Sequence, residues 1–230
     1  MSSVPATRWV LEALVDVSAL SAVQAACVQH GGFVAHAERF DCVRFGVSRA
    51  EASAMDPQQR LLLEVGYEAL HGAGARRSSL LGGVEGVFVG IERPDWALAQ
   101  PPTARRSVYA VTGDNVSVAA GRLSFVLGLQ GPCASFETAC SASLVACHSA
   151  ARALQHRECE TALVAGVNML FSAEASFVTG LAGMTSPRGR SHTFDVRADG
   201  YARGEACCAA VLEGASIPRF PNVGLMPHPS

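Results

Sequence analysis

The chain has 230 residues, of which 49% are hydrophobic and 17% are charged, and its formal net charge at pH 7 is −2. This composition is typical of a folded α/β protein with a large interior and excludes a disordered chain. The small net charge and the scattered arginines argue against a nucleic-acid partner, and no apolar run is long enough to span a membrane.

The eight cysteines are spread through apolar stretches, and none of them forms a C-x-x-C pair. The sequence therefore offers no ligand spacing for a metal ion, and we expect none to be bound. The scatter indicates reduced thiols in a cytoplasmic compartment rather than a disulfide framework. Glu12 and Asp16 interrupt the apolar character of the N-terminus, so we expect no secretory signal.

The first elements in chain order are short. Residues 1–29 carry only a weak pattern, and we leave their structure open. His30-Gly31-Gly32-Phe33-Val34 indicates a turn into a short extended segment. A short helix is expected over 48–54, with Ser48 as its N-cap and Glu51 at the capping-box spacing.

The clearest helix begins after Asp56. Asp56 is a suitable N-cap, Pro57 stands at the first helical position, and glycines at 72 and 74 mark the end. Leu62, Val65 and Ala69 are spaced to form its buried stripe.

Arg60 and Glu64 lie four residues apart on the same helix. We expect them to form an exposed pair. Such a pair contributes little to stability.

The remaining regular segments are apolar runs separated by polar loops. Strands are predicted over 86–91, 161–168 and 206–212, and the first of them has the character of a central strand in a parallel sheet. A helix with small residues is expected over 113–125. Residues 92–107 indicate a surface loop, and residues 184–204 a long functional or covering loop.

One stretch predicts a strand, a tight turn and a helix, with a cysteine in the turn. It reads S-F-E-T-A-C-S-A-S-L-V-A-C-H-S-A-A over 135–151, and Cys140 occupies the turn. Leu144, Cys147 and Ala151 are spaced for one buried side of the helix. Backbone N–H groups at a helix N-terminus favour a thiolate and a developing oxyanion, so Cys140 is a candidate nucleophile. The alternative is a small buried cysteine that fills the strand–helix junction.

Six runs in this order resemble the N-terminal half of a β-ketoacyl synthase, the ketosynthase domain of polyketide synthases in the thiolase-like superfamily. The runs are H-G-G-F at 30–33, A-M-D-P-Q-Q-R-L-L-L-E-V-G-Y-E-A-L at 54–70, G-V-F-V-G at 86–90, S-V-A-A-G-R-L-S-F-V-L-G-L-Q-G-P-C at 117–133, E-T-A-C-S-A-S-L-V-A at 137–146 and S-P-R-G-R-S-H-T-F-D-V-R-A-D-G-Y-A-R-G-E-A at 186–206. The resemblance covers residues 30–212, and D-P-Q-Q-R followed by T-A-C-S-x-S-L-V-A is highly specific.

This resemblance implies an α/β protein with the layered αβα fold of the thiolase-like superfamily, in the form of the N-terminal half of a duplicated architecture. We expect a ketosynthase N-terminal domain over 30–213, preceded by the weakly patterned segment 1–29 and followed by an unstructured tail over 214–230. The family usually forms a homodimer through the strand before the nucleophile. A cytoplasmic location is expected, with a plastid left open as an alternative.

The resemblance also implies a reaction. Cys140 would accept an acyl chain from the phosphopantetheine thioester of an acyl carrier protein. A decarboxylative Claisen condensation with a malonyl-type thioester would follow. No cofactor would be bound directly, because the carrier protein brings the phosphopantetheine.

The sequence departs from the family in two respects. Glu137 stands where such sequences usually carry Asp. The H-G-T-G-T and G-H motifs, which supply two catalytic histidines in the family, are absent. His148 lies eight residues after Cys140, about 12 Å along a helix axis, so we interpret it as a packed or surface residue. We therefore expect a truncated ketosynthase that does not catalyse condensation alone. We also expect the chain to associate, because the apolar stripe of Leu62, Val65 and Ala69 would lose part of the protein surface that covers it in the family.

Two other functions are alternatives to this one. The first is a non-catalytic ketosynthase-like module that only dimerises or docks a carrier protein. The second is a cysteine hydrolase with a nucleophile elbow. That elbow requires glycines two residues on either side of the nucleophile, where this chain has Thr138 and Ala142.

Overall fold

A computed structural model describes residues 2–5, 8–9, 20–92, 95–100 and 106–214. The predicted tail over 215–230 lies outside this part of the chain. The strands are β1 (Ser2–Ser3), β2 (His30–Gly31), β3 (Gly86–Ile91), β4 (Cys133–Phe136), β5 (Thr161–Asn168) and β6 (Ala206–Glu213). The α-helices are α2 (Ala22–Cys27), α3 (Cys42–Phe45), α4 (Arg49–Ala54), α5 (Pro57–Gly72), α6 (Arg77–Leu80), α7 (Trp96–Ala99), α8 (Ala110–Gly113), α9 (Val116–Leu127), α10 (Ala142–His156) and α11 (Ala173–Leu181).

The main sheet has the strand order β4-β3-β5-β6. Strand β3 pairs in parallel with both β4 and β5, whereas β6 pairs antiparallel with β5. The predicted central position of β3 is therefore confirmed. Because β3, β4 and β5 run the same way, their carboxyl ends meet at one edge of the sheet, where ligands of α/β proteins commonly bind.

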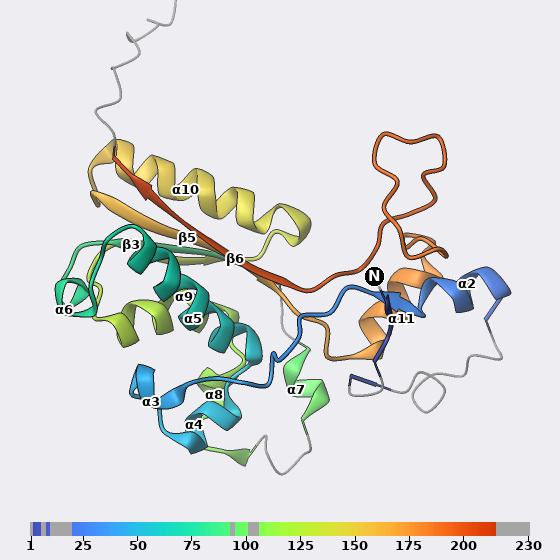
Figure 1. The fold of residues 1–230 in the computed structure, drawn as a ribbon, viewed down its shortest axis with the longest axis horizontal. Helices are drawn as coiled ribbons and strands as arrows, with labels where there is room; N and C mark the ends of the chain where they lie inside the picture. Colours follow the sequence, from blue (N-terminus) through green and yellow to red (C-terminus); the bar gives the residue numbers. More distant parts are fainter. Residues whose placement is uncertain (1, 6–7, 10–19, 93–94, 101–105, 215–230) are drawn as a thin grey trace, which may run out of the picture.

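Helices cover both faces of this sheet, which gives three layers (Figure 1). Helix α10 packs on one face, and α5 and α9 pack on the other. Successive residues of a strand point to opposite faces, so Val87, Val89 and Ile91 join the core under α5 and α9. Phe88 and Val164 join the smaller core under α10. The expected αβα layering is confirmed.

Helix α5 starts as the sequence predicts but buries a different stripe. Asp56 caps it by accepting a hydrogen bond from the Gln58 amide at 2.7 Å, and Pro57 is its first residue. Leu62 is fully buried, whereas the predicted Val65 and Ala69 are only half-buried. The rest of the buried apolar face is formed by Leu63, Gly66 and Leu70.

The expectation of an exposed Arg60–Glu64 pair is wrong. Arg60 is only 8% exposed, and its guanidinium lies over the Trp96 ring at 5.7 Å from the centroid. Glu64 instead accepts a hydrogen bond from the Asp41 amide. The aromatic ring offers the guanidinium a face to stack on, which lets Arg60 leave water.

Helix α4 has the predicted N-cap without the reciprocal half of a capping box. The Ser48 hydroxyl accepts from the Glu51 amide at 3.1 Å. The Glu51 carboxylate turns away and pairs with Arg122 on α9 at 2.6 Å. A local signal thus identified the helix, but a distant cation determined the direction of the side chain.

The described part of the N-terminal segment is tied to the rest of the fold. Strand β1 pairs with β2, and Trp9 is buried beside Val28 and Leu170. Arg8 forms an ion pair with Glu205, whose side chain is fully buried, at 2.7 Å. The boundary between residues 29 and 30 stays a prediction.

The long loop over 184–204 is confirmed as a loop and projects from the body of the molecule (Figure 1). An isolated bridge between Thr185 and Tyr201 closes its base, and Arg188 pairs with Asp199. None of the helices in the described residues is long and apolar enough to cross a membrane.

Candidate active site

The nucleophile candidate lies in the predicted strand–turn–helix unit. Strand β4 ends at Phe136, a single turn of 3₁₀ helix spans Ala139–Ser141, and α10 begins at Ala142. The Ser141 hydroxyl donates to the Thr138 carbonyl oxygen at 2.7 Å and closes the turn. Cys140 therefore stands at the N-terminal end of α10 and at the carboxyl edge of the sheet. Its side chain is exposed.

The backbone of this turn is left-handed at one position. Ala139 has φ +52, a conformation that a non-glycine residue adopts rarely. The strain is of the kind that clusters at functional sites. No local pattern could have predicted it, because alanine does not mark a left-handed position.

Two strand glycines let α10 approach the sheet closely. A Cβ on Gly90 of β3 would lie 2.5 Å from the Ser143 Cα. A Cβ on Gly166 of β5 would lie 2.8 Å from the Ser143 Cβ. The first turn of α10 therefore rests on bare backbone, and this contact fixes where Cys140 sits relative to the ends of the strands.

The predicted buried side of α10 is wrong. Leu144 is 71% exposed, and Cys147 and Ala151 are only half-buried. The buried face consists of alanines, at positions 142, 146, 150 and 153. A helix held this close to the sheet has room there for methyl groups but not for a leucine side chain.

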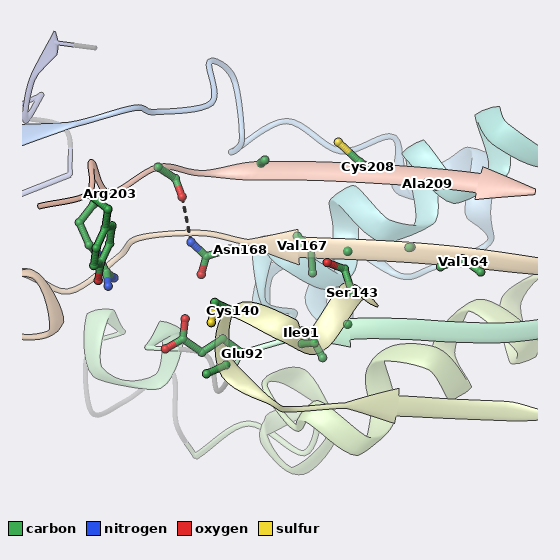
Figure 2. Close-up of a pocket in the computed structure, with 18 of the residues that line it drawn as sticks. Ile91, Glu92, Cys140, Ser143, Val164, Val167, Asn168, Arg203, Cys208 and Ala209 are labelled. Atoms are coloured by element: carbon green, nitrogen blue, oxygen red, sulfur yellow. Dashed lines mark hydrogen bonds between the residues drawn. The ribbon is translucent and has the colours of Figure 1, made fainter. Parts of the chain in front are cut away.

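Cys140 lines a cavity of about 1020 Å³ on the α10 face of the sheet (Figure 2). The wall comes from α10, from the ends of β3 and β5, and from the start of β6. Its polar side chains include Glu92, Ser143, Asn168 and Arg203. The cavity is large enough for a drug-sized organic ligand.

Two of the polar groups have defined surroundings. The Asn168 amide nitrogen donates to the Gly204 carbonyl oxygen at 2.9 Å, which ties the end of β5 to the loop residues just before β6 (Figure 2). The Nε of Arg203 is buried and makes no hydrogen bond. Cys208 is exposed in the same cavity, whereas burial raises the pKa of its neighbour Cys207 to about 12.

A second cavity, of about 1200 Å³, adjoins the first. Glu92, Thr179 and Arg203 line both cavities. The outer wall of the second cavity comes from residues 110–116 and from helix α11. Glu137, the departure from the family's aspartate, lies in this second wall and not in the first.

No histidine stands among the described residues that line the Cys140 cavity. His148 is exposed on α10, in agreement with its interpretation as a surface residue. Within the described residues, no three His, Cys, Asp or Glu side chains are arranged to hold a metal ion. Sequence reasoning proposed Cys140 alone and missed Gly90, Gly166 and Asn168. Glycines inside predicted strands were the available signal, since such glycines often mark a close backbone approach.

Three comparisons agree on the family. The model of the β-ketoacyl synthase N-terminal domain matches residues 1–216. One of the proteins that form the phenolphthiocerol/phthiocerol polyketide synthase of Mycobacterium tuberculosis is 42% identical over 217 residues, which are 91% of this chain and 10% of that protein. The phthioceranic/hydroxyphthioceranic acid synthase of Mycobacterium bovis is 36% identical over 214 residues, with 93% and 10% covered.

Solved ketosynthases have the same fold. A mutant of the ketosynthase from module 6 of the Bacillus subtilis bacillaene synthase superposes with a TM-score of 0.79 at 33% identity, covering 92% of this chain and 34% of that one. The oxazolomycin ketosynthase domain from Streptomyces albus gives 0.80 at 31% identity, covering 92% and 37%. The chain therefore spans about a third of these ketosynthase chains and a tenth of the polyketide synthases. It belongs to the β-ketoacyl synthase family, of which it contains the N-terminal domain with the thiolase-like fold.

Proposed function

We propose that Cys140 accepts an acyl group from a thioester carried on the phosphopantetheine of an acyl carrier protein. The observation that carries the proposal is the placement of an exposed thiol at the N-terminal end of α10, inside a cavity of about 1020 Å³. The names of the relatives, which are polyketide synthases and ketosynthases, support the same chemistry. A buried structural cysteine would not line an open cavity.

The step is a transthioesterification. The Cys140 sulfur attacks the thioester carbonyl carbon and forms a tetrahedral intermediate, whose oxyanion faces backbone N–H groups of the α10 N-terminus. Collapse of the intermediate breaks the bond to the pantetheine sulfur. The pantetheine thiolate leaves and takes up the proton that Cys140 gave up, so the products are an acyl-cysteine and a free pantetheine thiol.

In the whole family reaction, the acyl-cysteine would condense with a malonyl-type thioester, with loss of CO₂. We propose that these 230 residues supply the acyl-accepting part of that reaction. Strand β4 forms an edge of the described sheet, which suits pairing with the same strand of a second copy in a homodimer. The eight free cysteines suit a reducing compartment, such as the cytoplasm.

The test is mass spectrometry of the chain after incubation with acetyl-pantetheine. We expect one acetyl adduct, mapped to Cys140 and absent in Cys140→Ala. Cys208→Ser is the matched control, because Cys208 is an exposed thiol in the same cavity. Acetylation that persists in Cys140→Ala, or that never forms, would leave the non-catalytic docking module as the function.

A further inference from the structure

The first turn of α5 carries a buried polar network that the proposed reaction does not use. Asp56, Gln58, Gln59 and Arg60 are exposed at only 0%, 2%, 2% and 8%. Burial of polar side chains is costly unless they are hydrogen-bonded. Their partners therefore indicate what this turn holds in place.

Gln59 and its neighbour Gln58 bind different parts of the molecule. The Gln59 amide nitrogen donates to the backbone carbonyl oxygens of Thr112 at 3.2 Å and Asn115 at 3.4 Å. The Gln58 side-chain nitrogen donates instead to the Asp56 carboxylate. Its side-chain oxygen accepts from the backbone N–H of Met169, the residue that follows β5. Two adjacent, equally buried glutamines thus anchor separate segments.

Arg122 on α9 also binds the segment that Gln59 contacts. Its Nε donates to the Gln59 side-chain oxygen at 2.6 Å, and its guanidinium also reaches the Thr112 carbonyl oxygen at 3.3 Å. Glu51 balances its charge at 2.6 Å. The segment 112–115 is also held from the backbone, because the Asp56 amide donates to the Gly113 carbonyl oxygen at 2.7 Å.

This held segment forms part of one wall of the second cavity. Asp114 and Asn115 within it line the cavity, as do its neighbours Ala110, Val111 and Val116. Three residues are shared between this cavity and the one that contains Cys140, so the two spaces adjoin. A group attached to Cys140 that outgrows the first cavity therefore meets the wall that Gln59 and Arg122 hold.

We propose that Gln59 and Arg122 are positioning residues that fix the wall over 110–116 and so determine how well Cys140 accepts long acyl chains. The proposal rests on the proposed acyl transfer. A short acyl group ends within the first cavity and does not contact the wall. The effect is therefore specific to long chains, which a general loss of stability would not produce.

The experiment compares Gln59→Met with Gln58→Met. The second change removes the hydrogen bonds to Asp56 and Met169 and leaves those from Gln59 to Thr112 and Asn115 in place. Rates of acylation of Cys140 by acetyl-pantetheine and decanoyl-pantetheine are measured over a range of thioester concentration. For Gln59→Met we expect decanoyl transfer to fall about tenfold, mainly through a higher KM, with acetyl transfer within about twofold of the parent. For Gln58→Met we expect the ratio of the two rates to stay unchanged.

Hydrogen exchange of the amides over 110–116 gives a readout that is independent of catalysis. We expect faster exchange there in Gln59→Met and not in Gln58→Met. If Gln59→Met does not fold, Gln59→Glu replaces it, because it keeps the oxygen that pairs with Arg122 and loses only the donor to Thr112 and Asn115. Equal effects of the two glutamine changes on exchange or on the rate ratio would overturn the positioning role. Failure of the parent chain to accept either thioester would instead overturn the proposed function.

Discussion

A Cβ atom on Gly90 would lie 2.5 Å from the Ser143 Cα, so the first turn of α10 rests directly on strand β3. Cys140 lies three residues before Ser143, in the turn that leads into the helix. The distance between helix and sheet at this one contact therefore sets the position of the thiol at the edge of the cavity.

We expect Gly90→Ala to displace the N-terminal turn of α10 and slow the modification of Cys140. The added methyl group overlaps backbone atoms, which cannot rotate away, and overpacking of this kind costs about 1–3 kcal/mol. Denaturant unfolding and the rate of iodoacetamide labelling at Cys140 measure the two effects. Gly121→Ala is the control, since its Cβ would enter open space on α9. Replacing glycine by alanine inside a helix raises the free energy of unfolding by about 0.5–1 kcal/mol. Wild-type labelling in Gly90→Ala would contradict the role of this contact.

Cys140 is expected to be the most reactive of the eight thiols. It is exposed at a helix N-terminus and lines the open cavity, so an electrophile can reach its sulfur. Burial raises the pKa of the Cys159 thiol and raises that of Cys207 to about 12, so both react slowly. Peptide mapping after limiting iodoacetamide gives the order of labelling. Cys133 and Cys208 are exposed without a helix N-terminus, and labelling of either before Cys140 would count against the nucleophile.

Stability should fall as the pH rises from 4 to 6. Burial raises the pKa of Asp56 from 3.8 to about 6, so between these values the folded chain binds a proton that the unfolded chain does not. The contribution of Asp56 to the free energy of unfolding is complete below the pKa of the unfolded state. It is lost as the pH rises through the pKa of the folded state, by up to about 3 kcal/mol. Urea unfolding across this range should show the slope, and Asp56→Asn should remove it.

The control for this slope is Asp195→Asn on the exposed loop. Hydrogen bonds from Arg197 lower the pKa of Asp195 to about 2, which lies below the range of the measurement. The slope should persist in this variant. A pH dependence that survives in Asp56→Asn would assign the effect to another group.

Local signals predicted the elements well. Helix α5 has the cap and proline of its sequence signature, and β5 coincides with the predicted strand over 161–168. Both signals lie within one segment and depend on no distant contact. The packing faces of the helices were predicted less well, because they depend on what the rest of the chain brings to them.

The site shows why the buried face of α10 and the polar residues of the cavity could not be predicted from the sequence. Helical spacing allows either Leu144 or the alanine row to face the sheet, and hydrophobicity alone favours the leucine. The choice is reversed by Gly90 and Gly166, which bring the helix too close for leucine. The antiparallel pairing of β6 with β5 places Ala206 beside Asn168, and Arg203, three residues before Ala206, lines the same cavity. No local pattern in the sequence reports that pairing.

The isolated chain is expected to associate in solution. Loss of cover over the α5 stripe is not the cause, because Leu62 is fully buried. Other large apolar side chains are exposed instead: Phe125 at 88%, Phe194 at 106% and Val196 at 101%. Burial of such side chains between two chains favours association. Light scattering after size exclusion measures it, and the combined changes Phe125→Ser, Phe194→Ser and Val196→Ser should shift the chain toward the monomer. A monodisperse parent chain would refute the expectation.

Finally, the 230-residue chain is expected to accept an acyl group without condensing it. Acylation requires only a reactive thiol and oxyanion donors, and we expect the turn over 138–142 to supply these in part. Decarboxylation of a malonyl thioester leaves an enolate, whose oxygen needs donors opposite the nucleophile, and no histidine lines the described cavity. Loss of one such donor typically costs about 10²–10³ in rate, so we expect no detectable condensation by these 230 residues, which contain neither histidine motif. The assay combines acetylated chain with malonyl-carrier protein and follows CO₂ release and the β-ketoacyl product, with Cys140→Ala as control. Condensation that depends on Cys140 would show that the chain forms its own decarboxylation site, and His30, His148 and His192 would then be the side chains to replace.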